Sequence, residues 1–152
     1  MREEKVTIHL LNWLERNEWK IVCYDFPQSG TGVMLHPNFE TTQSTKNKGG
    51  IIPDILAIRG SICLFFENKD RFVMSDFEKV KAVKQLGNYS YSLNKLLAPY
   101  NINKIYYGIG IPSIEKDVQK SLDNIYGLDF LISTDIDGNI KVDYDSNGIL
   151  SA

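Results

Sequence analysis

The sequence predicts an α/β protein in which a mixed central sheet is flanked by helices. Short runs rich in β-branched and aromatic residues alternate with longer segments whose apolar residues recur at helical spacing. Two pairs of the β-rich runs are also joined by tight-turn residues, which is typical of antiparallel hairpins. The 152 residues, 43% of them hydrophobic, suit a single domain over residues 1–152.

The first quarter of the chain predicts one helix and two strands before a long loop. Glu3–Arg16 carries apolar residues at helical spacing, so we expect an amphipathic helix there. Lys20–Phe26 is β-rich and ends before a proline, and Val33–Leu35 is short enough for a minor strand. Glu40–Gly50 contains no apolar residue and predicts a loop of a length that is often functional.

The middle of the chain predicts a hairpin followed by a long helix. Ile51–Ile58 and Ile62–Phe66 are apolar and flank the turn residues Arg59-Gly60-Ser61. Ser75–Ala98 follows with an N-capping residue at its start and a proline just after its end. Gly87 lies inside this stretch, where it is expected to bend or break the helix.

The last third predicts a strand, a helix and a second hairpin. Lys104–Ile111 is a strand, and the helix runs from Ser113 to Tyr126, just before a glycine. Leu128–Ser133 and Ile140–Tyr144 form the hairpin around Asp137-Gly138. No repeat or linker divides the chain.

Charge and cysteine content exclude several classes of protein. The net charge of −2 argues against a uniformly basic nucleic-acid-coating protein, although it allows a local basic face. Cys23 and Cys63 are forty residues apart with no CxxC motif, which argues against a structural zinc site and favours buried thiols in a reducing compartment. The polar start and the short apolar runs predict a cytoplasmic protein without membrane association.

Three charged residues interrupt the apolar hairpin. Asp54 lies in its first strand, and Glu67 and Lys69 follow at the end of its second. If the turn is centred on Arg59-Gly60, Asp54 lies opposite Phe65 and diagonal to Glu67, so the three charged side chains share one face. This arrangement depends on the register, because a slip of one residue would move Asp54 to the other face.

The residue types at this point suit phosphodiester hydrolysis. Two neighbouring carboxylates provide the oxygen ligands that Mg²⁺ prefers, and the ion can stabilise charge developing on a phosphate. A lysine beside them can position the attacking water or deprotonate it. From the chemistry alone, a structural acid–lysine pair at the sheet edge remains an equal alternative.

The same residues resemble the signature of the PD-(D/E)xK nucleases. Pro53-Asp54, twelve intervening residues and Glu67-Asn68-Lys69 are similar to that motif. The predicted elements resemble the αβββαβ core of restriction endonucleases, and Gln85 with Tyr89 resembles the QxxxY element of RecB-like members. The resemblance covers roughly residues 3–112.

The resemblance implies a single nuclease-like domain that uses Mg²⁺, for which Mn²⁺ can substitute. Asp54, Glu67 and the peptide carbonyl of Asn68 would bind the metal. Lys69 would be the catalytic lysine, and Gln85 would orient that lysine or the phosphate.

The resemblance also bears on a third carboxylate and on a set of DNA contacts. Many members of the family carry a glutamate in the first helix, but Thr7 stands at the expected position here, so Glu4, or Glu3 beside it, is the substitute. The expected DNA contacts flank the motif along the chain: Lys46, Lys48, Arg71, Lys84 and Tyr89.

The function expected from the sequence is a Mg²⁺-dependent DNA endonuclease resembling small type II restriction enzymes. A homodimer is expected, because two related active sites would match the two strands of duplex DNA. The alternatives are a structure-specific or repair nuclease, such as a Holliday-junction resolvase, and a non-catalytic protein that binds nucleic acid on the same scaffold.

Overall fold

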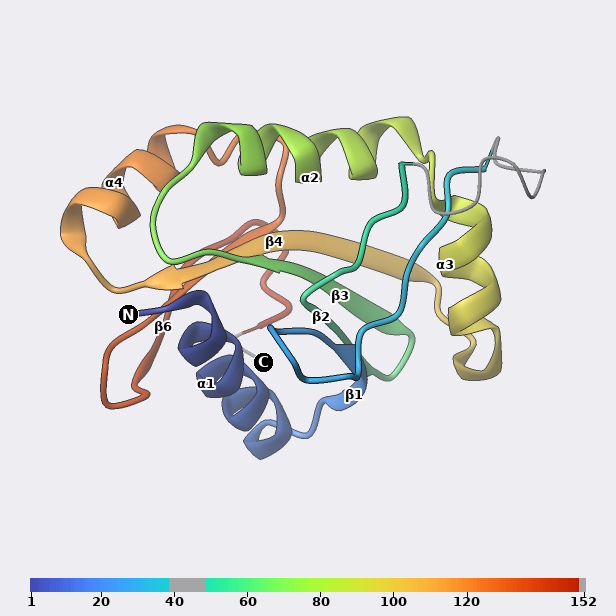
Figure 1. Ribbon diagram of the computed structural model, residues 1–152, viewed down its shortest axis with the longest axis horizontal. Helices are drawn as coiled ribbons and strands as arrows, with labels where there is room; N and C mark the ends of the chain where they lie inside the picture. The colour runs from blue at the N-terminus through green and yellow to red at the C-terminus, as the bar shows by residue number, and fades with distance from the viewer. Residues whose placement is uncertain (39–48, 151–152) are drawn as a thin grey trace.

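The computed structural model describes residues 1–38 and 49–150 and shows one mixed sheet with helices on both faces (Figure 1). The elements follow in the order α1 (Glu3–Arg16), β1 (Lys20–Tyr24), β2 (Ile55–Arg59), β3 (Ile62–Asn68), α2 (Met74–Leu86), α3 (Ser90–Leu97), a 3₁₀ turn (Ala98–Tyr100), β4 (Lys104–Pro112), α4 (Glu115–Asp123), β5 (Phe130–Thr134) and β6 (Ile140–Asp145). The predicted α/β class and the mixed sheet flanked by helices are confirmed.

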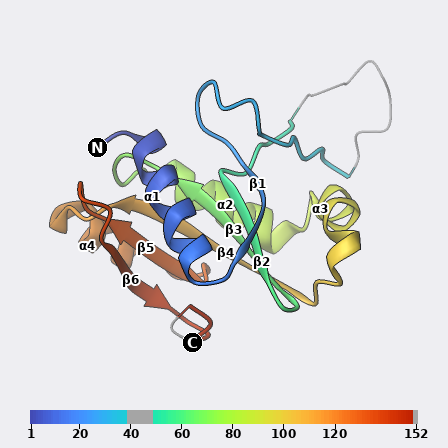
Figure 2. The same ribbon diagram turned by 90° about the horizontal axis from the view of Figure 1, so that it is seen from below.

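The six strands are neighbours in the sheet in the same order as in the chain. β1, β2 and β3 pair antiparallel, β3, β4 and β5 pair parallel, and β6 returns antiparallel to β5. Both parallel connections pass through helices on one face, formed by α2, α3 and α4, while α1 covers the other face (Figures 1 and 2). The carboxyl ends of β3, β4 and β5 therefore meet at one edge of the sheet.

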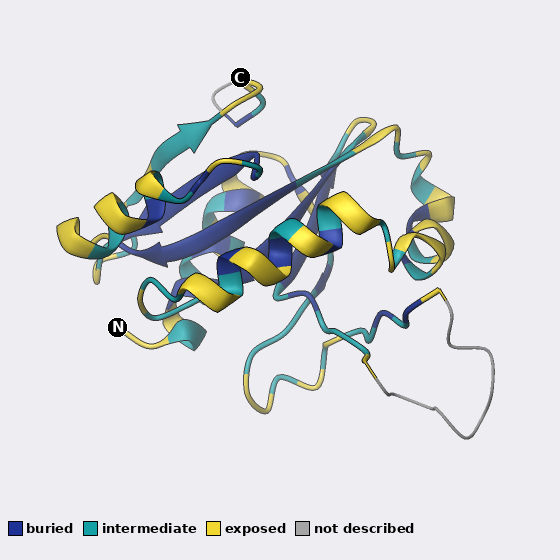
Figure 3. Cartoon of the chain, turned by 90° about the horizontal axis from the view of Figure 1, so that it is seen from above, coloured by how far each residue is buried: buried dark blue, intermediate teal, exposed yellow. Residues whose placement is uncertain are grey.

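The strands divide their apolar side chains between two cores because successive residues point to opposite faces. In β3, Phe65 packs in the core beneath α2 and α4, whereas Leu64 and Phe66 pack against α1. Figure 3 shows the central strands as buried and the outer surfaces of the helices as exposed. Both faces of β3 are thus filled, so a charged residue at its end must find partners locally.

Two glycines in β4 let the α1 face pack closely. A Cβ atom at Gly108 would lie 2.2 Å from the ring of Phe130. A Cβ atom at Gly110 would lie 2.4 Å from Oδ1 of Asn68 and 2.5 Å from Leu10 of α1. Only hydrogen fits at these positions, which brings β4 against the neighbouring strands and α1.

The predicted register of the hairpin is wrong by two residues. Ile58 pairs with Cys63 and Arg59 with Ile62, so Asp54 lies across from Glu67, one step beyond the last pair of the ladder, and not opposite Phe65. β2 extends through Arg59, and the guanidinium group of Arg59 is held by residues outside the hairpin. It donates to the carbonyl oxygens of Asn17 and Ile149 and lies 4.3 Å from the ring of Trp19.

This shift leaves the predicted faces unchanged, because a displacement of two residues restores the side-chain alternation. Asp54 and Glu67 therefore still point to the α2 side of the sheet. The turn itself is now Gly60-Ser61, with Gly60 at φ +61°.

Two predicted segments are divided in the structure. The strand expected from Ile51 begins only at Ile55, since Pro53 cannot donate a ladder hydrogen bond, and Ile51 forms an isolated bridge with Leu35 instead. The long helix expected over residues 75–98 breaks at Gly87, whose φ of +62° ends α2.

The remaining differences concern element ends. α4 covers only Glu115–Asp123 of the helix expected over residues 113–126. Most of the loop expected over residues 40–50 lies outside the described residues. No helix within residues 1–38 and 49–150 is both long and apolar enough to cross a lipid bilayer.

We expect Gly108→Ala to lower the free energy of unfolding by about 3 kcal/mol or more, because the new methyl group would overlap the Phe130 ring. Gly60→Ala is the matched control. Gly60 has a positive φ but open space around it, so only the backbone cost of about 1 kcal/mol applies. Urea denaturation of both variants measures the difference, and equal losses would contradict the close approach of β4.

Candidate active site

Two carboxyl groups face each other where β2 begins and β3 ends. Glu67 is in β3 with a side chain only 7% exposed. Asp54 directly precedes β2, and its Oδ2 accepts the Asn68 N–H at 2.7 Å. Its own N–H donates to the Phe66 carbonyl oxygen at 3.1 Å, which extends the β2–β3 pairing to Asp54. The hairpin thus places both acids on one face of the sheet.

Asn68 connects this site to α1 on the opposite face. Its side chain is fully buried, and its amide Nδ2 donates to Thr7 Oγ1 at 3.0 Å. The Thr7 hydroxyl in turn donates to the Glu3 carbonyl oxygen at 3.1 Å, one turn earlier in the helix. These hydrogen bonds hold the first turn of α1 beside the end of β3.

Lys69 lies among three carboxylates. Its Nζ is 3.3 Å from Glu3 Oε1, 3.5 Å from Asp76 Oδ1 and 3.6 Å from Glu67 Oε2. Glu3 comes from α1 and Asp76 from the first turn of α2, so the lysine joins helices that cover opposite faces. Lys69 follows the last residue of β3, where its side chain can reach both helices past the end of the sheet.

A second lysine approaches Glu67 from α2. The Nζ of Lys79 is 3.7 Å from Glu67 Oε1, so each oxygen of this carboxylate faces a different ammonium group. Lys79 follows Asp76 by three residues, which places the two side chains on neighbouring positions of one helix face.

Burial and mutual repulsion perturb the carboxyl groups. Burial, followed by the neighbouring Glu67 carboxylate, raises the pKa of Asp54 to about 8. Burial also raises the pKa of Glu67, although Lys79 and Lys69 oppose this shift. For Lys69, burial lowers the pKa, but Glu67, Glu3 and Asp76 outweigh it and raise the pKa to about 12.

The charges of the site do not balance. Four carboxyl groups surround two ammonium groups, which gives a formal charge of −2 when all six are ionised. The six residues are Glu3, Asp54, Glu67, Asp76, Lys69 and Lys79. A divalent cation would supply the missing charge, and without one the site retains a proton on Asp54 near neutral pH.

The donor set fits Mg²⁺ better than a transition metal. Within the described part of the chain, no group of three His, Cys, Asp or Glu side chains lies close enough to hold a metal by side chains alone. Mg²⁺ commonly binds through one or two carboxylates and completes its shell with water and substrate phosphate. Asp54 and Glu67 provide the two carboxylates, and the Asn68 peptide borders them through its N–H.

Glu3, not Glu4, is the acid of α1 that reaches this site. Glu3 forms the ion pair with Lys69, whereas Glu4 makes no ion pair among the residues described. The two neighbours differ because Thr7, one turn after Glu3, is anchored to Asn68 and orients that side of the helix toward β3.

Gln85 and Lys84 lie at the other end of α2. They follow Asp76 by eight or nine residues, about 12–14 Å along the helix axis. The side-chain amide of Gln85 lies beside Gly127, and Lys84 pairs with Asp129 at 3.0 Å. The structure does not bring either residue to the carboxylate pair.

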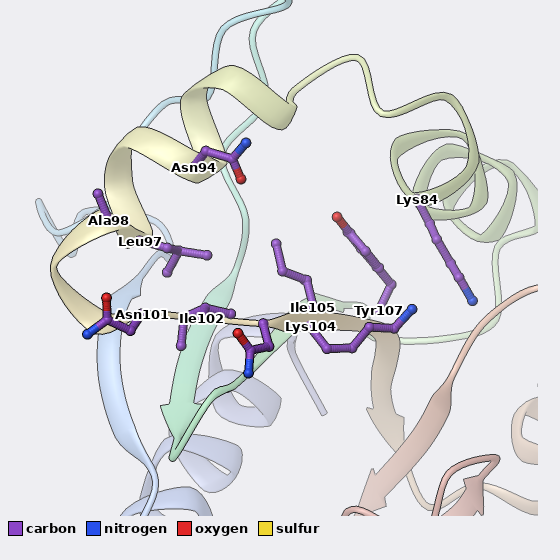
Figure 4. A pocket seen from close by; sticks show the side chains of 10 residues that line it. Lys84, Asn94, Leu97, Ala98, Asn101, Ile102, Lys104, Ile105 and Tyr107 are labelled. Atoms are coloured by element: carbon purple, nitrogen blue, oxygen red, sulfur yellow. The ribbon is translucent and has the colours of Figure 1, made fainter.

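Lys84 instead borders a pocket of about 540 Å³ between the end of α2, α3 and the start of β4. Figure 4 shows Lys84, Asn94 and Tyr107 entering this pocket from three different elements. The Asp129 carboxylate that pairs with Lys84 also accepts the backbone N–H of Tyr107, so Lys84 belongs to a polar network away from the carboxylate pair.

The other expected DNA contacts are dispersed. Arg71 is exposed and pairs with Asp70 at 2.9 Å, close in sequence to Lys69. The Tyr89 hydroxyl donates to the Gly49 carbonyl oxygen at 2.7 Å. Lys46 and Lys48 lie outside the described residues.

The sequence analysis missed Asp76 and Lys79 as members of the site, and it left open whether Glu3 or Glu4 supplies the acid from α1. The available signal is the Asp76–Lys79 spacing in the first turns of the helix that follows Lys69, because positions three apart face the same way.

Comparisons with known proteins add no identification. No family model matches the chain, and neither the curated proteins nor the solved structures provide a match.

We expect the stability of the metal-free protein to decline as the pH rises from about 4 to about 8, because of Asp54. Its pKa rises on folding from 3.8 to about 8, so the folded state keeps a proton that the unfolded state has released. The stability that this proton provides is lost as the pH approaches 8.

Asp54→Asn should remove much of this decline, since the amide cannot ionise but can still accept the Asn68 N–H. Urea midpoints in EDTA at pH 5.5, 7 and 8.5 test this, with the exposed Glu78→Gln as the control carboxylate. Parallel pH profiles for wild type and Asp54→Asn would refute the perturbed titration.

Proposed function

We propose that the protein is a Mg²⁺-dependent DNA endonuclease resembling small type II restriction enzymes. The observation that carries this proposal is the meeting of Asp54, Glu67 and Lys69 on one face at the end of the β2–β3 hairpin. The PD-(D/E)xK-like motif and the order α1–β1–β2–β3–α2 around it support the same proposal.

The charges suit the stabilisation of a reacting phosphodiester. A divalent cation bound by Asp54 and Glu67, with the Asn68 carbonyl, would offset charge on the phosphate and lower the pKa of a bound water. Lys69, whose pKa of about 12 keeps it an ammonium group, would supply hydrogen-bond donors and positive charge to the attacked phosphate. Glu3 and Asp76 would hold that ammonium group in position.

Double-stranded DNA is the proposed substrate, and a homodimer is the proposed form of the enzyme. One domain carries one carboxylate pair, whereas cutting both strands of a duplex in one encounter needs two. A two-fold dimer would supply both sites with the symmetry of its target. The cytoplasm is the proposed compartment, in keeping with the two free buried thiols, Cys23 and Cys63.

Mg²⁺ should raise the melting temperature of the protein. A cation that binds only the folded form stabilises it by RT ln(1 + [L]/Kd), about 1.4 kcal/mol at ten times Kd. The shift should be larger at pH 8.5 than at pH 6, because the cation competes with the proton on Asp54.

Thermal denaturation with and without millimolar Mg²⁺ measures this shift. Asp54→Asn should respond much less than wild type, and Glu78→Gln should respond as wild type does. A melting temperature that ignores Mg²⁺ at both pH values would argue against a preformed cation site.

Asp54→Ala and Lys69→Ala should each slow cleavage by about 1,000-fold or more, since both groups act on charge that develops in the transition state. Their DNA affinities should diverge in EDTA. Asp54→Ala should bind as tightly as wild type or more tightly, because an acid facing phosphate is removed. Lys69→Ala should bind slightly less tightly, by about one phosphate contact.

The substrates for this experiment are phage DNA, supercoiled plasmid and a four-way junction, each with Mg²⁺ or EDTA, followed as single-turnover time courses beside gel-shift titrations. The exposed Lys120→Ala is the charge control. Discrete fragments from linear duplex support the proposal, and cleavage confined to the junction indicates a structure-specific nuclease. Wild-type cleavage rates in Lys69→Ala would refute the catalytic assignment.

A further inference from the structure

Lys69 and Lys79 both pair with Glu67, but they differ in their other ion-pair partners. Lys69 also pairs with Glu3 and Asp76, and its side chain is 25% exposed. Lys79 has Glu67 as its only ion-pair partner within residues 1–38 and 49–150, and its side chain is 44% exposed. Loss of the Glu67 contact would therefore leave Lys69 in place and release Lys79.

We infer that Lys79 is an exchangeable phosphate ligand, which pairs with Glu67 in the metal-free protein and transfers to a DNA phosphate when Glu67 binds a divalent cation. This inference rests on the proposed nuclease function and adds to it a coupling between cation binding and DNA binding. It assigns Lys79 a substrate contact in addition to its ion pair with Glu67.

Electrostatic interactions favour both steps of the exchange, the release of Lys79 from Glu67 and its binding to a DNA phosphate. Glu67 cannot satisfy a divalent cation and two ammonium groups equally, because like charges within about 4 Å repel strongly where solvent is limited. The ammonium group with the fewest other partners is the one displaced. An arriving phosphate carries the negative charge that Lys79 has lost, and the partly exposed position on α2 lets the flexible side chain reach outward.

The exchange implies that cation binding and DNA binding strengthen each other. If cation binding frees Lys79 for phosphate, DNA binding must strengthen cation binding by the same factor. In the absence of DNA, Lys79 instead competes with the cation for Glu67. The same side chain should thus weaken cation binding to the free protein and strengthen DNA binding to the cation-loaded protein.

Lys79→Met tests both effects, with Lys120→Met as a matched loss of one exposed lysine and Lys79→Arg as the charge-preserving variant. Calorimetric titration with Mn²⁺ in the absence of DNA should show Lys79→Met binding several-fold more tightly than wild type. Lys120→Met should bind as wild type does. Equal Mn²⁺ affinity in wild type and Lys79→Met would overturn the inference, whether or not the protein cleaves DNA.

DNA affinity is then measured by gel shift with a plasmid-derived duplex in EDTA and in Ca²⁺, on samples in which the DNA remains intact. In EDTA, Lys79→Met should match wild type, because Lys79 is already occupied by Glu67. In Ca²⁺, the variant should bind more weakly, and the slope of log K against log salt should fall by about 1. Lys79→Arg should restore the slope.

The outcomes separate this inference from the proposed function. If wild type cleaves DNA but Lys79→Met shows the same Ca²⁺-dependent affinity as wild type, only the exchange is wrong. If the variant loses affinity equally in EDTA and Ca²⁺, Lys79 is a permanent phosphate contact and the exchange is again wrong. If wild type neither binds nor cleaves DNA, the nuclease proposal fails and the exchange fails with it.

Discussion

The site depends on the pairing of β2 with β3, because that register places Asp54 across from Glu67. Arg59 stabilises the register from the far end of the hairpin, through two carbonyl oxygens and the face of Trp19. At the near end, Asp54 accepts the Asn68 N–H and so closes the ladder with a carboxylate. The hydrogen bond from the Asn68 N–H to the Asp54 carboxylate therefore places the carboxyl groups of Asp54 and Glu67 side by side. Both groups are largely shielded from water there, which disfavours their charged forms.

The surrounding helices are arranged to tolerate this unfavourable charge without cancelling it. α1 supplies Glu3 and α2 supplies Asp76, and both pair with Lys69 while their charges also help to raise the pKa of Glu67. The outcome is a well-held ammonium group beside acids that retain an excess negative charge. Unfavourable charge that lowers the stability of the folded protein is typical of binding sites, and a bound ligand restores that stability. This excess of negative charge is one of the observations on which the proposed cation site rests.

Local patterns were sufficient for the fold class, for most elements and for the face shared by Asp54 and Glu67, since each depends on periodicity and turn residues. The register was predicted wrongly, because a two-residue turn can be centred on either Arg59-Gly60 or Gly60-Ser61 and the structure uses the second pair. The contacts of Glu3 and Asp76 with Lys69 could not be read from local patterns, since they form only once the helices pack. For Gln85, the motif spacing predicted a role beside the lysine or the phosphate. The path of α2, which ends at Gly87, instead places the Gln85 side chain beside Gly127.

Because side chains alternate between the two faces of the sheet, as Glu67 and Asn68 do, the hairpin turn can accept only certain sequence changes. Gly60-Ser61 is solvent-accessible and about 20 Å from Asp54 at 3.4 Å per residue, so substitutions there look harmless. A change of length that slips β2 by one residue against β3 is different, because it would turn Asp54 into the apolar layer under α1 while the pairing with β4 keeps Glu67 on its own face. Length changes at this exposed turn therefore preserve the carboxylate pair only where the loop itself takes up the extra residue and the strands keep their register.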